Sequence, residues 1–281
     1  MRSLVRMIIG AAVFLFSPLL FAAVDGAAIA ASDQGGEWRA YGRDYSEQRY
    51  SPLTQVTDKN AGQLKLDWYL DMPDSKALAA TPLVVDGVMY FTASQSIVMA
   101  VDAITGSVLW RYDPQVLERL RDKKHMRFNW GTNRGLAFWK GRVYVGTFDG
   151  RLIALDAKSG KESWSVQTFD PKEPRYITGA PRVFKDMVLI GHGGAEAGAI
   201  RGYVTAYDTS TGKQKWRTWI VPGNPADGFE SEALKQAATT WRGDWWIHGG
   251  GGTVWNSMTY DSEVERVYLG TGNGAPSNQE I

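Results

Sequence analysis

The feature that most constrains the fold is a box of the form A-x-D-x-x-x-G-x-x-x-W, which occurs three times in the 281-residue chain. The tryptophans that end the boxes stand at positions 110, 164 and 216, so they are 54 and 52 residues apart. Self-similarity at a period of about 50 residues is typical of propellers and other repeat arrays. We therefore expect one structural unit to recur along the chain. The three copies are Ala100–Trp110, Ala154–Trp164 and Ala206–Trp216.

Short apolar segments separated by tight turns fill the space between the boxes. In residues 82–91, Asp86 and Gly87 stand between two apolar stretches, which is a strong hairpin signal. Residues 140–155 and 187–207 repeat the pattern, and a further unit begins at Asn256. We predict an all-β fold, a β-propeller built from four-stranded antiparallel blades.

Each residue of the box has a structural role. The Asp is expected to start a turn by accepting bonds from backbone amides ahead of it, and the Gly to supply a positive φ. The Trp then lies on a strand, where it can pack against the neighbouring blade. The box therefore predicts architecture and carries no chemistry of its own.

The number of boxes predicts an incomplete ring. At about 50 residues per blade, the segment 32–281 provides about four to five blades, and we expect it to be a partial propeller domain. Propellers close into a ring to protect the edges of their sheets. The chain is therefore expected to be the N-terminal portion of a longer protein, or to need a partner that closes the ring.

The N-terminus has the order of features found in secretory signal peptides. Arg2 and Arg6 precede the apolar run 7–23, and Ala28-Ile-Ala30 fits a small-residue cleavage site. We predict a signal peptide over residues 1–31 and export to the periplasm, with no stable membrane span after cleavage. The alternative is an uncleaved anchor helix, but the run is shorter than the ~20 apolar residues that a span needs.

Composition excludes several classes of function. The chain has 31 Lys and Arg against 30 Asp and Glu, so it lacks the basic field that nucleic-acid binding requires. The absence of cysteine excludes disulfides, thiolate metal sites and C-x-x-C-H haem attachment within this chain. The histidines at 125, 192 and 248 do not have metal-ligand spacing, so zinc is not expected.

Three glycine-rich stretches interrupt the repeat, and function on β scaffolds usually lies in such loops. Arg134 stands before Gly135, where a planar guanidinium could bind an anion or remain solvated. Glu196 lies in a glycine-rich loop, where it could bind a hard cation or be an exposed carboxylate. Trp255 follows four glycines and could form a flat floor for an aromatic ligand or belong to the core, and Asn273 offers a further oxygen ligand.

Together these stretches resemble the pyrroloquinoline-quinone (PQQ)-dependent alcohol dehydrogenases, the methanol/ethanol dehydrogenase family of eight-bladed quinoproteins. The resemblance covers nearly all of the chain after the predicted signal peptide. The most specific motifs are Asn133-Arg-Gly135, Thr178-Gly-Ala-Pro181, Gly193-Gly-Ala-Glu196, and the glycine-rich segment from Trp255 to Asn273.

The resemblance implies a function and a set of site residues. It implies oxidation of a small-molecule alcohol by hydride transfer to PQQ at a Ca²⁺ site, with electrons passed to an acceptor such as a cytochrome c. The residues at matching positions would contact the cofactor or the metal. Arg134 would bond to quinone oxygens, Thr178 to a PQQ carboxylate, Gly194 and Ala195 through their backbone, Trp255 by stacking, and Glu196 and Asn273 would coordinate Ca²⁺.

The chain departs from the family pattern in three ways. Phe128 and Asn129 occupy positions where family members often have two adjacent cysteines, and Ala79 stands where a PQQ-contacting Glu is common. The family's catalytic Asp lies beyond the position of Asn273, so we assign no catalytic residue here. The alternative function is a non-catalytic periplasmic β-propeller that acts as a scaffold for protein interactions.

Overall fold

The computed structural model describes residues 24–31, 36–73, 75–122, 131–195 and 198–275. Within them, three antiparallel four-stranded sheets and one two-stranded sheet confirm the predicted all-β propeller fold. The first sheet contains β1 (Leu83–Val85), β2 (Val88–Thr92), β3 (Val98–Asp102) and β4 (Val108–Tyr112); the second contains β5 (Ala137–Trp139), β6 (Arg142–Gly146), β7 (Arg151–Asp156) and β8 (Glu162–Gln167). The third contains β9 (Arg182–Phe184), β10 (Met187–Ile190), β11 (Tyr203–Asp208) and β12 (Gln214–Trp219), and the last pairs β13 (Met258–Asp261) with β14 (Arg266–Leu269).

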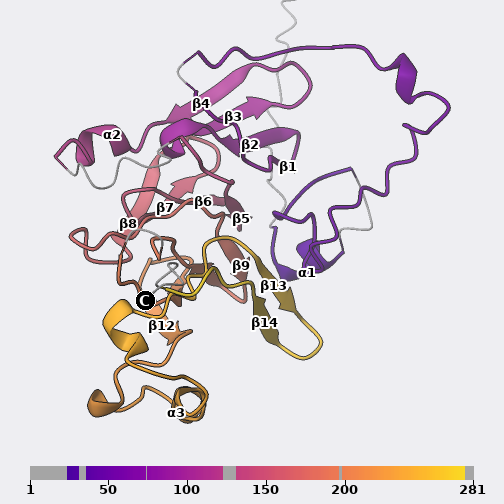
Figure 1. The fold of residues 1–281 in the computed structure, drawn as a ribbon. Helices are drawn as coiled ribbons and strands as arrows, with labels where there is room; N and C mark the ends of the chain where they lie inside the picture. The colour runs from indigo at the N-terminus through magenta and orange to yellow at the C-terminus, as the bar shows by residue number, and fades with distance from the viewer. Residues whose placement is uncertain (1–23, 32–35, 74, 123–130, 196–197, 276–281) are drawn as a thin grey trace, which may run out of the picture.

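The sheets are blades that follow one another in chain order. Figure 1 shows them descending from β4 near the top of the view to β12 near the bottom. Within each blade, neighbouring strands are consecutive in sequence. The inner strands carry the buried apolar side chains, which form one continuous core across adjacent blades; among them are Tyr90, Phe138, Tyr144 and Ile153.

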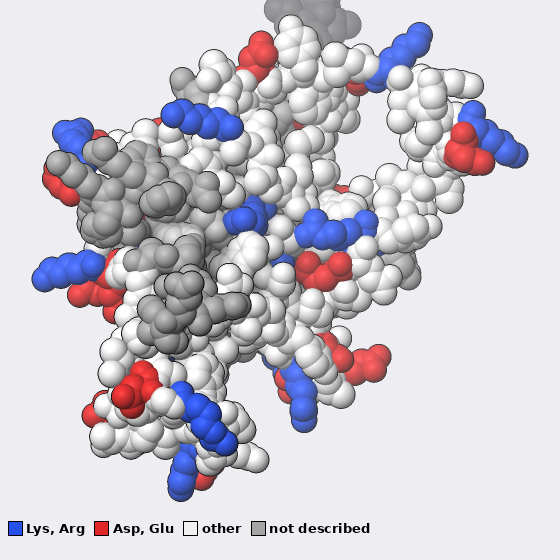
Figure 2. All heavy atoms as spheres, in the orientation of Figure 1, with Lys and Arg blue, Asp and Glu red and all other residues white. Residues whose placement is uncertain are grey.

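Short helices lie outside the blades. They are α1 (Gly26–Ala30), α2 (Val116–Arg119) and α3 (Glu232–Ala238), with 3-10 turns η1 (Ala61–Gln63), η2 (Ser94–Ser96), η4 (Pro225–Asp227) and η5 (Trp245–His248). In the part of the chain that the structure describes, no helix is both long and apolar enough to cross a membrane. On the face shown in Figure 2, basic and acidic side chains are interspersed.

The box turns have the predicted chemistry. Asp102 Oδ1 accepts bonds from the amides of Ile104 and Thr105 at 3.0 and 2.7 Å, and Gly106 has a φ of 73°. These bonds lower the pKa of Asp102, as similar bonds do for Asp156 and Asp208. In all three blades the register shifts immediately after the Ala of the box, where the fourth strand carries one extra residue, so each blade has a bulge at the same place.

Two of the box tryptophans, Trp110 and Trp164, dock on the turn of the next blade. The Trp110 indole N–H donates to the Ala157 carbonyl at 2.9 Å, and its ring lies against Gly160, where an added Cβ would come within 2.6 Å of it. Trp164 makes the equivalent contacts with Thr209 and Gly212 in the third blade. The glycine is thus required twice, for its positive φ and for the absence of a side chain under the indole.

Trp68, in the segment 36–73 before the first blade, makes the same kind of contact. Its indole N–H donates to the Ala103 carbonyl at 3.3 Å, and its ring covers Gly106. This role could not be predicted from the sequence because no box precedes Trp68. The segment before the first blade therefore packs on that blade in the same way as the fourth strand of the first blade packs on the second blade.

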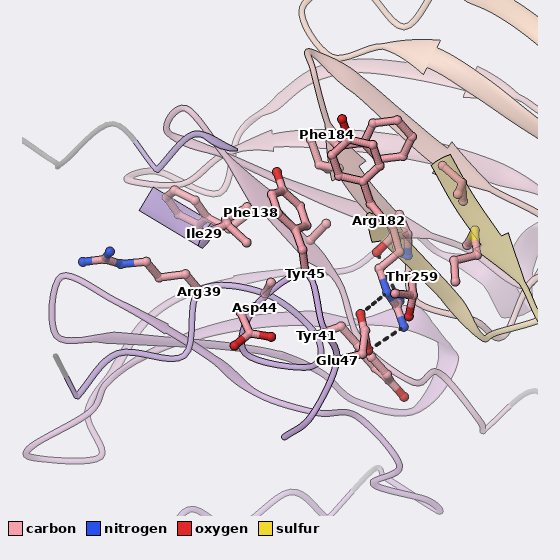
Figure 3. Close-up of a pocket in the computed structure, with 17 residues that line it drawn as sticks. Ile29, Arg39, Tyr41, Asp44, Tyr45, Glu47, Phe138, Arg182, Phe184 and Thr259 are labelled. Atoms are coloured by element: carbon pink, nitrogen blue, oxygen red, sulfur yellow. Dashed lines mark hydrogen bonds and ion pairs between the residues drawn. The ribbon is translucent and has the colours of Figure 1, made fainter. Parts of the chain in front are cut away.

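Residues 24–31 are built into the fold. The Val24 carbonyl accepts from the Lys140 amide at 2.9 Å, Ile29 is 2% exposed, and both belong to the main core. Asp25 caps the N-terminus of α1. Ile29 lines a small pocket of about 30 Å³ with Phe138, shown in Figure 3 together with the Arg182–Glu47 ion pair. Val24 and Ile29 thus contribute to the same core as the first blades.

We expect the Gly160→Ala variant to unfold more readily than Gly141→Ala. Gly141 also has a positive φ (76°), but an added Cβ there meets nothing within 4 Å, so Ala costs only the backbone strain of about 1–2 kcal/mol. At Gly160 the clash with Trp110 should add about 1–3 kcal/mol. Urea unfolding of both variants tests this, and equal losses would show that the Trp–Gly contact contributes nothing.

We also expect any processed form of the protein to retain Val24. Cleavage after Ala30 would remove two core side chains, Val24 and Ile29, and expose the apolar surface that they cover. Intact-mass and N-terminal peptide analysis of protein recovered from expressing cells would locate the cut. A mature chain that begins at Ala31 or Ser32 would contradict the expectation.

Candidate cofactor site

The segments that enter the first strand of each blade lie side by side. The Thr81 amide donates to the Arg134 carbonyl at 3.1 Å, and the Arg134 amide donates to the Thr178 carbonyl at 2.9 Å. These residues precede β1, β5 and β9 by a few positions. Three blades are therefore joined at their inner ends by backbone hydrogen bonds, and the side chains of these segments converge.

A buried asparagine fixes the loop that carries Arg134. Asn133 is 1% exposed, and its amide nitrogen donates to Ser96 Oγ at 3.0 Å and to the Gly146 carbonyl at 2.8 Å. Its Oδ1 accepts from the Gly135 amide at 3.0 Å. In the Asn-Arg-Gly motif, Asn133 is thus a structural pin, and the side chain of the next residue is left to face the site.

Arg134 lies between two other residues that the sequence analysis selected. Its Nη1 donates to Thr178 Oγ1 at 2.7 Å, and its guanidinium carbon lies 4.6 Å from the centroid of the Trp255 ring. Burial lowers the pKa of Arg134, but arginine stays charged at any ordinary pH. The site therefore contains a partly desolvated cation with donors available for an anion.

The glycine run positions Trp255. All four glycines from Gly249 to Gly252 have φ near +70°, a conformation that other residues rarely adopt. The Gly252 amide donates to the Asn273 carbonyl at 3.0 Å, and the Gly272 amide to the Thr253 carbonyl at 2.7 Å. These bonds bring Asn273 beside Trp255, which is 41% exposed and so retains an accessible indole surface.

A cavity of about 320 Å³ lies at the meeting point of these segments. Its size is within the range of small-molecule sites, about 300–1,000 Å³. Five of the residues selected from sequence line it: Arg134, Thr178, Ala195, Trp255 and Asn273.

The remaining selected positions are adjacent to the cavity or cannot be placed. Gly194 lies between two lining residues, Gly193 and Ala195. Glu196 lies outside the described residues, as do His125, Phe128 and Asn129. Ala79, where a family glutamate is common, is exposed and is not part of the lining.

Three further side chains line the cavity that were not predicted from the sequence: Thr132, Tyr176 and Thr253. Each stands two positions before a predicted site residue, namely Arg134, Thr178 or Trp255. In an extended segment, residues i and i+2 lie on the same side. These three residues could therefore have been predicted by taking every second residue of the segments that contain Arg134, Thr178 and Trp255.

The lining has the chemistry that a flat, anionic, aromatic ligand requires. Trp255 supplies an aromatic face, Arg134 a positive charge, and Thr178 and Thr253 hydroxyl groups. Among the described residues no group of three or more His, Asp or Glu could hold a metal ion. A metal here would depend on oxygen donors such as the exposed amide of Asn273, together with groups outside the described residues.

His192 is buried just behind the cavity wall. It is 1% exposed, and burial together with the charge of Arg175 lowers its pKa from 6.5 to about 3. The other titratable groups around it include Arg217, Glu173 and Tyr203. His192 is therefore neutral at physiological pH.

This histidine should make the protein sensitive to acid. Between pH 6.5 and about 3 the unfolded chain binds the His192 proton and the folded chain does not. The free energy of unfolding should therefore fall as pH falls through this window, with a slope of up to about 1.4 kcal/mol per pH unit from this group. His192→Asn should show a smaller slope in urea unfolding at pH 4–7, whereas parallel curves for both proteins would contradict the assignment.

Comparison with known proteins places this geometry in a family. Residues 38–279 match the family described as PQQ, the glucose/ethanol/alcohol dehydrogenase β-propeller domain. The quinohemoprotein alcohol dehydrogenase ADH IIB of Pseudomonas putida is 55% identical over 271 residues, which cover 95% of this chain and 39% of that protein. The chain thus spans less than half the length of this relative.

Solved structures agree with the sequence comparison. The quinohemoprotein alcohol dehydrogenase ADHIIG from Pseudomonas putida superposes with a TM-score of 0.84 at 51% identity, over 90% of this chain and 37% of that one. A europium-containing methanol dehydrogenase gives a TM-score of 0.74 at 32% identity, over 88% of this chain and 44% of that one. The propeller fold and the sequence match over residues 38–279 together show that this chain belongs to the PQQ-dependent alcohol dehydrogenase β-propeller family.

Proposed function

We propose that this chain is the N-terminal portion of an exported, periplasmic dehydrogenase that oxidises an alcohol with PQQ and Ca²⁺. The observation that carries the proposal is the convergence of Arg134, Thr178, Ala195, Trp255 and Asn273 on one cavity. Family membership and this cavity favour the enzyme over the non-catalytic scaffold.

The chain's own residues would bind and orient the cofactor. The Trp255 ring would lie against its aromatic plane, and Arg134 and Thr178 would donate to its oxygens. Glu196 and Asn273 would provide oxygen ligands for the metal, as Ca²⁺ prefers. When bound, PQQ supplies a hydride-accepting quinone carbonyl, which the metal polarises.

The proposal assigns no catalytic base within this chain. By the family resemblance, the base that takes the alcohol proton lies beyond Asn273 in the complete protein. The relative from Pseudomonas putida is named a quinohemoprotein, which supports a haem group, such as that of a cytochrome c, as the electron acceptor. The europium in the methanol dehydrogenase relative supports a metal at the site.

We expect Trp255→Ala in the complete protein to weaken PQQ binding by about 5- to 30-fold, because loss of a stacked aromatic surface costs about 1–2 kcal/mol. Trp68→Ala is the matched control, since Trp68 packs on the Gly106 turn of the first blade and does not line the cavity. Equilibrium dialysis with PQQ and Ca²⁺ measures both variants. If Trp255→Ala binds like the control, Trp255 is not part of the cofactor site.

A further inference from the structure

Two buried side chains, His192 and Arg175, support the part of the cavity wall formed by Gly193–Ala195. His192 Nδ1 donates to the Gly193 carbonyl at 2.9 Å. This fixes the proton on Nδ1 and leaves a lone pair on Nε2, which accepts from Arg175 Nη1 at 2.7 Å. The imidazole thus connects the wall to Arg175 through both of its nitrogens.

Arg175 is itself fixed on several sides. Its Nη1 also donates to the Arg201 carbonyl at 2.8 Å, its Nε pairs with Glu173 at 2.5 Å, and its guanidinium lies 4.8 Å from the Tyr203 ring centroid. Only about 5% of the residue is exposed, so an unmade bond here would leave a charged group unsatisfied in the interior. Arg175 is therefore a rigid support for His192.

The wall has little freedom to move relative to the segment that carries Arg175. The Gly193 amide donates to the Tyr176 carbonyl at 2.8 Å, and the Tyr176 ring fills the space where a Gly193 side chain would be. A Cβ on Gly194 would come within 2.4 Å of the Pro174 carbonyl oxygen. A shift of Arg175 or His192 would thus be transmitted directly to the lining residues Gly193 and Ala195.

We propose that Arg175 and His192 are positioning residues for the cofactor site, setting the place of the Gly193–Ala195 wall through the chain Arg175 Nη1–His192–Gly193 carbonyl. This inference rests on the proposed function, since it gives the wall a cofactor to bind. Neither residue is expected to touch PQQ, because neither lines the cavity. Supporting side chains of this kind typically change affinity by about 10- to 100-fold when removed.

The chain offers matched variants for a test in the complete protein. His192→Leu removes both bonds of the ring at similar volume, whereas His192→Asn keeps an N–H near the position of Nδ1. Arg175→Met removes the support. Arg217→Met is the control: Arg217 lies 4.0 Å from the same Tyr203 ring and bonds to Thr205 and to the Thr168 carbonyl.

Two readouts separate this proposal from the proposed function. Equilibrium dialysis gives the Kd for PQQ in the presence of Ca²⁺, and hydrogen exchange of the peptide spanning 191–195 reports the order of the wall without cofactor. We expect His192→Leu and Arg175→Met to raise the Kd about tenfold or more and to speed exchange. His192→Asn and Arg217→Met should stay within about threefold of the unmodified protein in both measurements.

Three outcomes would contradict the positioning role or the proposed function. If Arg217→Met weakens binding as much as Arg175→Met, the effect comes from general stability and the positioning role is wrong. It is also wrong if His192→Leu and Arg175→Met leave both the Kd and the exchange unchanged. If the unmodified protein does not bind PQQ, the proposed function fails, and the exchange rates alone decide whether these residues order the wall.

Discussion

The docking of one blade's tryptophan on the next blade's glycine turn sets the relation between blades. The indole places a broad apolar surface over a residue with no side chain, and its N–H donates to a carbonyl in the same turn. A tryptophan needs both an apolar contact and a hydrogen-bond acceptor when it is largely buried, and the turn offers both. Because Gly106, Gly160 and Gly212 receive the same contact from Trp68, Trp110 and Trp164, successive blades are joined in the same way.

The cavity lies where blades that pack in this repeated way meet at their inner ends. Blades arranged in this way bring the inner ends of their first strands together, where the backbones of Thr81, Arg134 and Thr178 pair across blade boundaries. Side chains on one side of these segments then point into a common space. The residues that carry the proposed chemistry lie on loops, and backbone hydrogen bonds between blades hold the loops of Arg134 and Thr178.

Much of the fold and part of the site could be predicted from the sequence. The box gave the turn at Asp102 and the period of the blades, because those contacts are formed within a dozen residues. Arg134, Thr178 and Trp255 could be selected because each stands in a motif of glycine and polar residues. His192 and Arg175 could not be paired in advance, since they are 17 residues apart and only the fold brings them together. The contact of Trp68 with the first blade could not be predicted for the same reason, because Trp68 and Ala103 are 35 residues apart.

By itself, the sequence determined the local structure. It showed where the turns form, which segments have the apolar pattern of strands, and which loops depart from the repeat. Only the tertiary structure decided which side chains meet. Residues 24–31 have the small apolar composition of a cleavage region, yet Val24 and Ile29 lie in the core because a hollow between blades accepts them. Arg134, Thr178 and Trp255 share one cavity because backbone hydrogen bonds between blades bring their segments together, although they are far apart in the sequence.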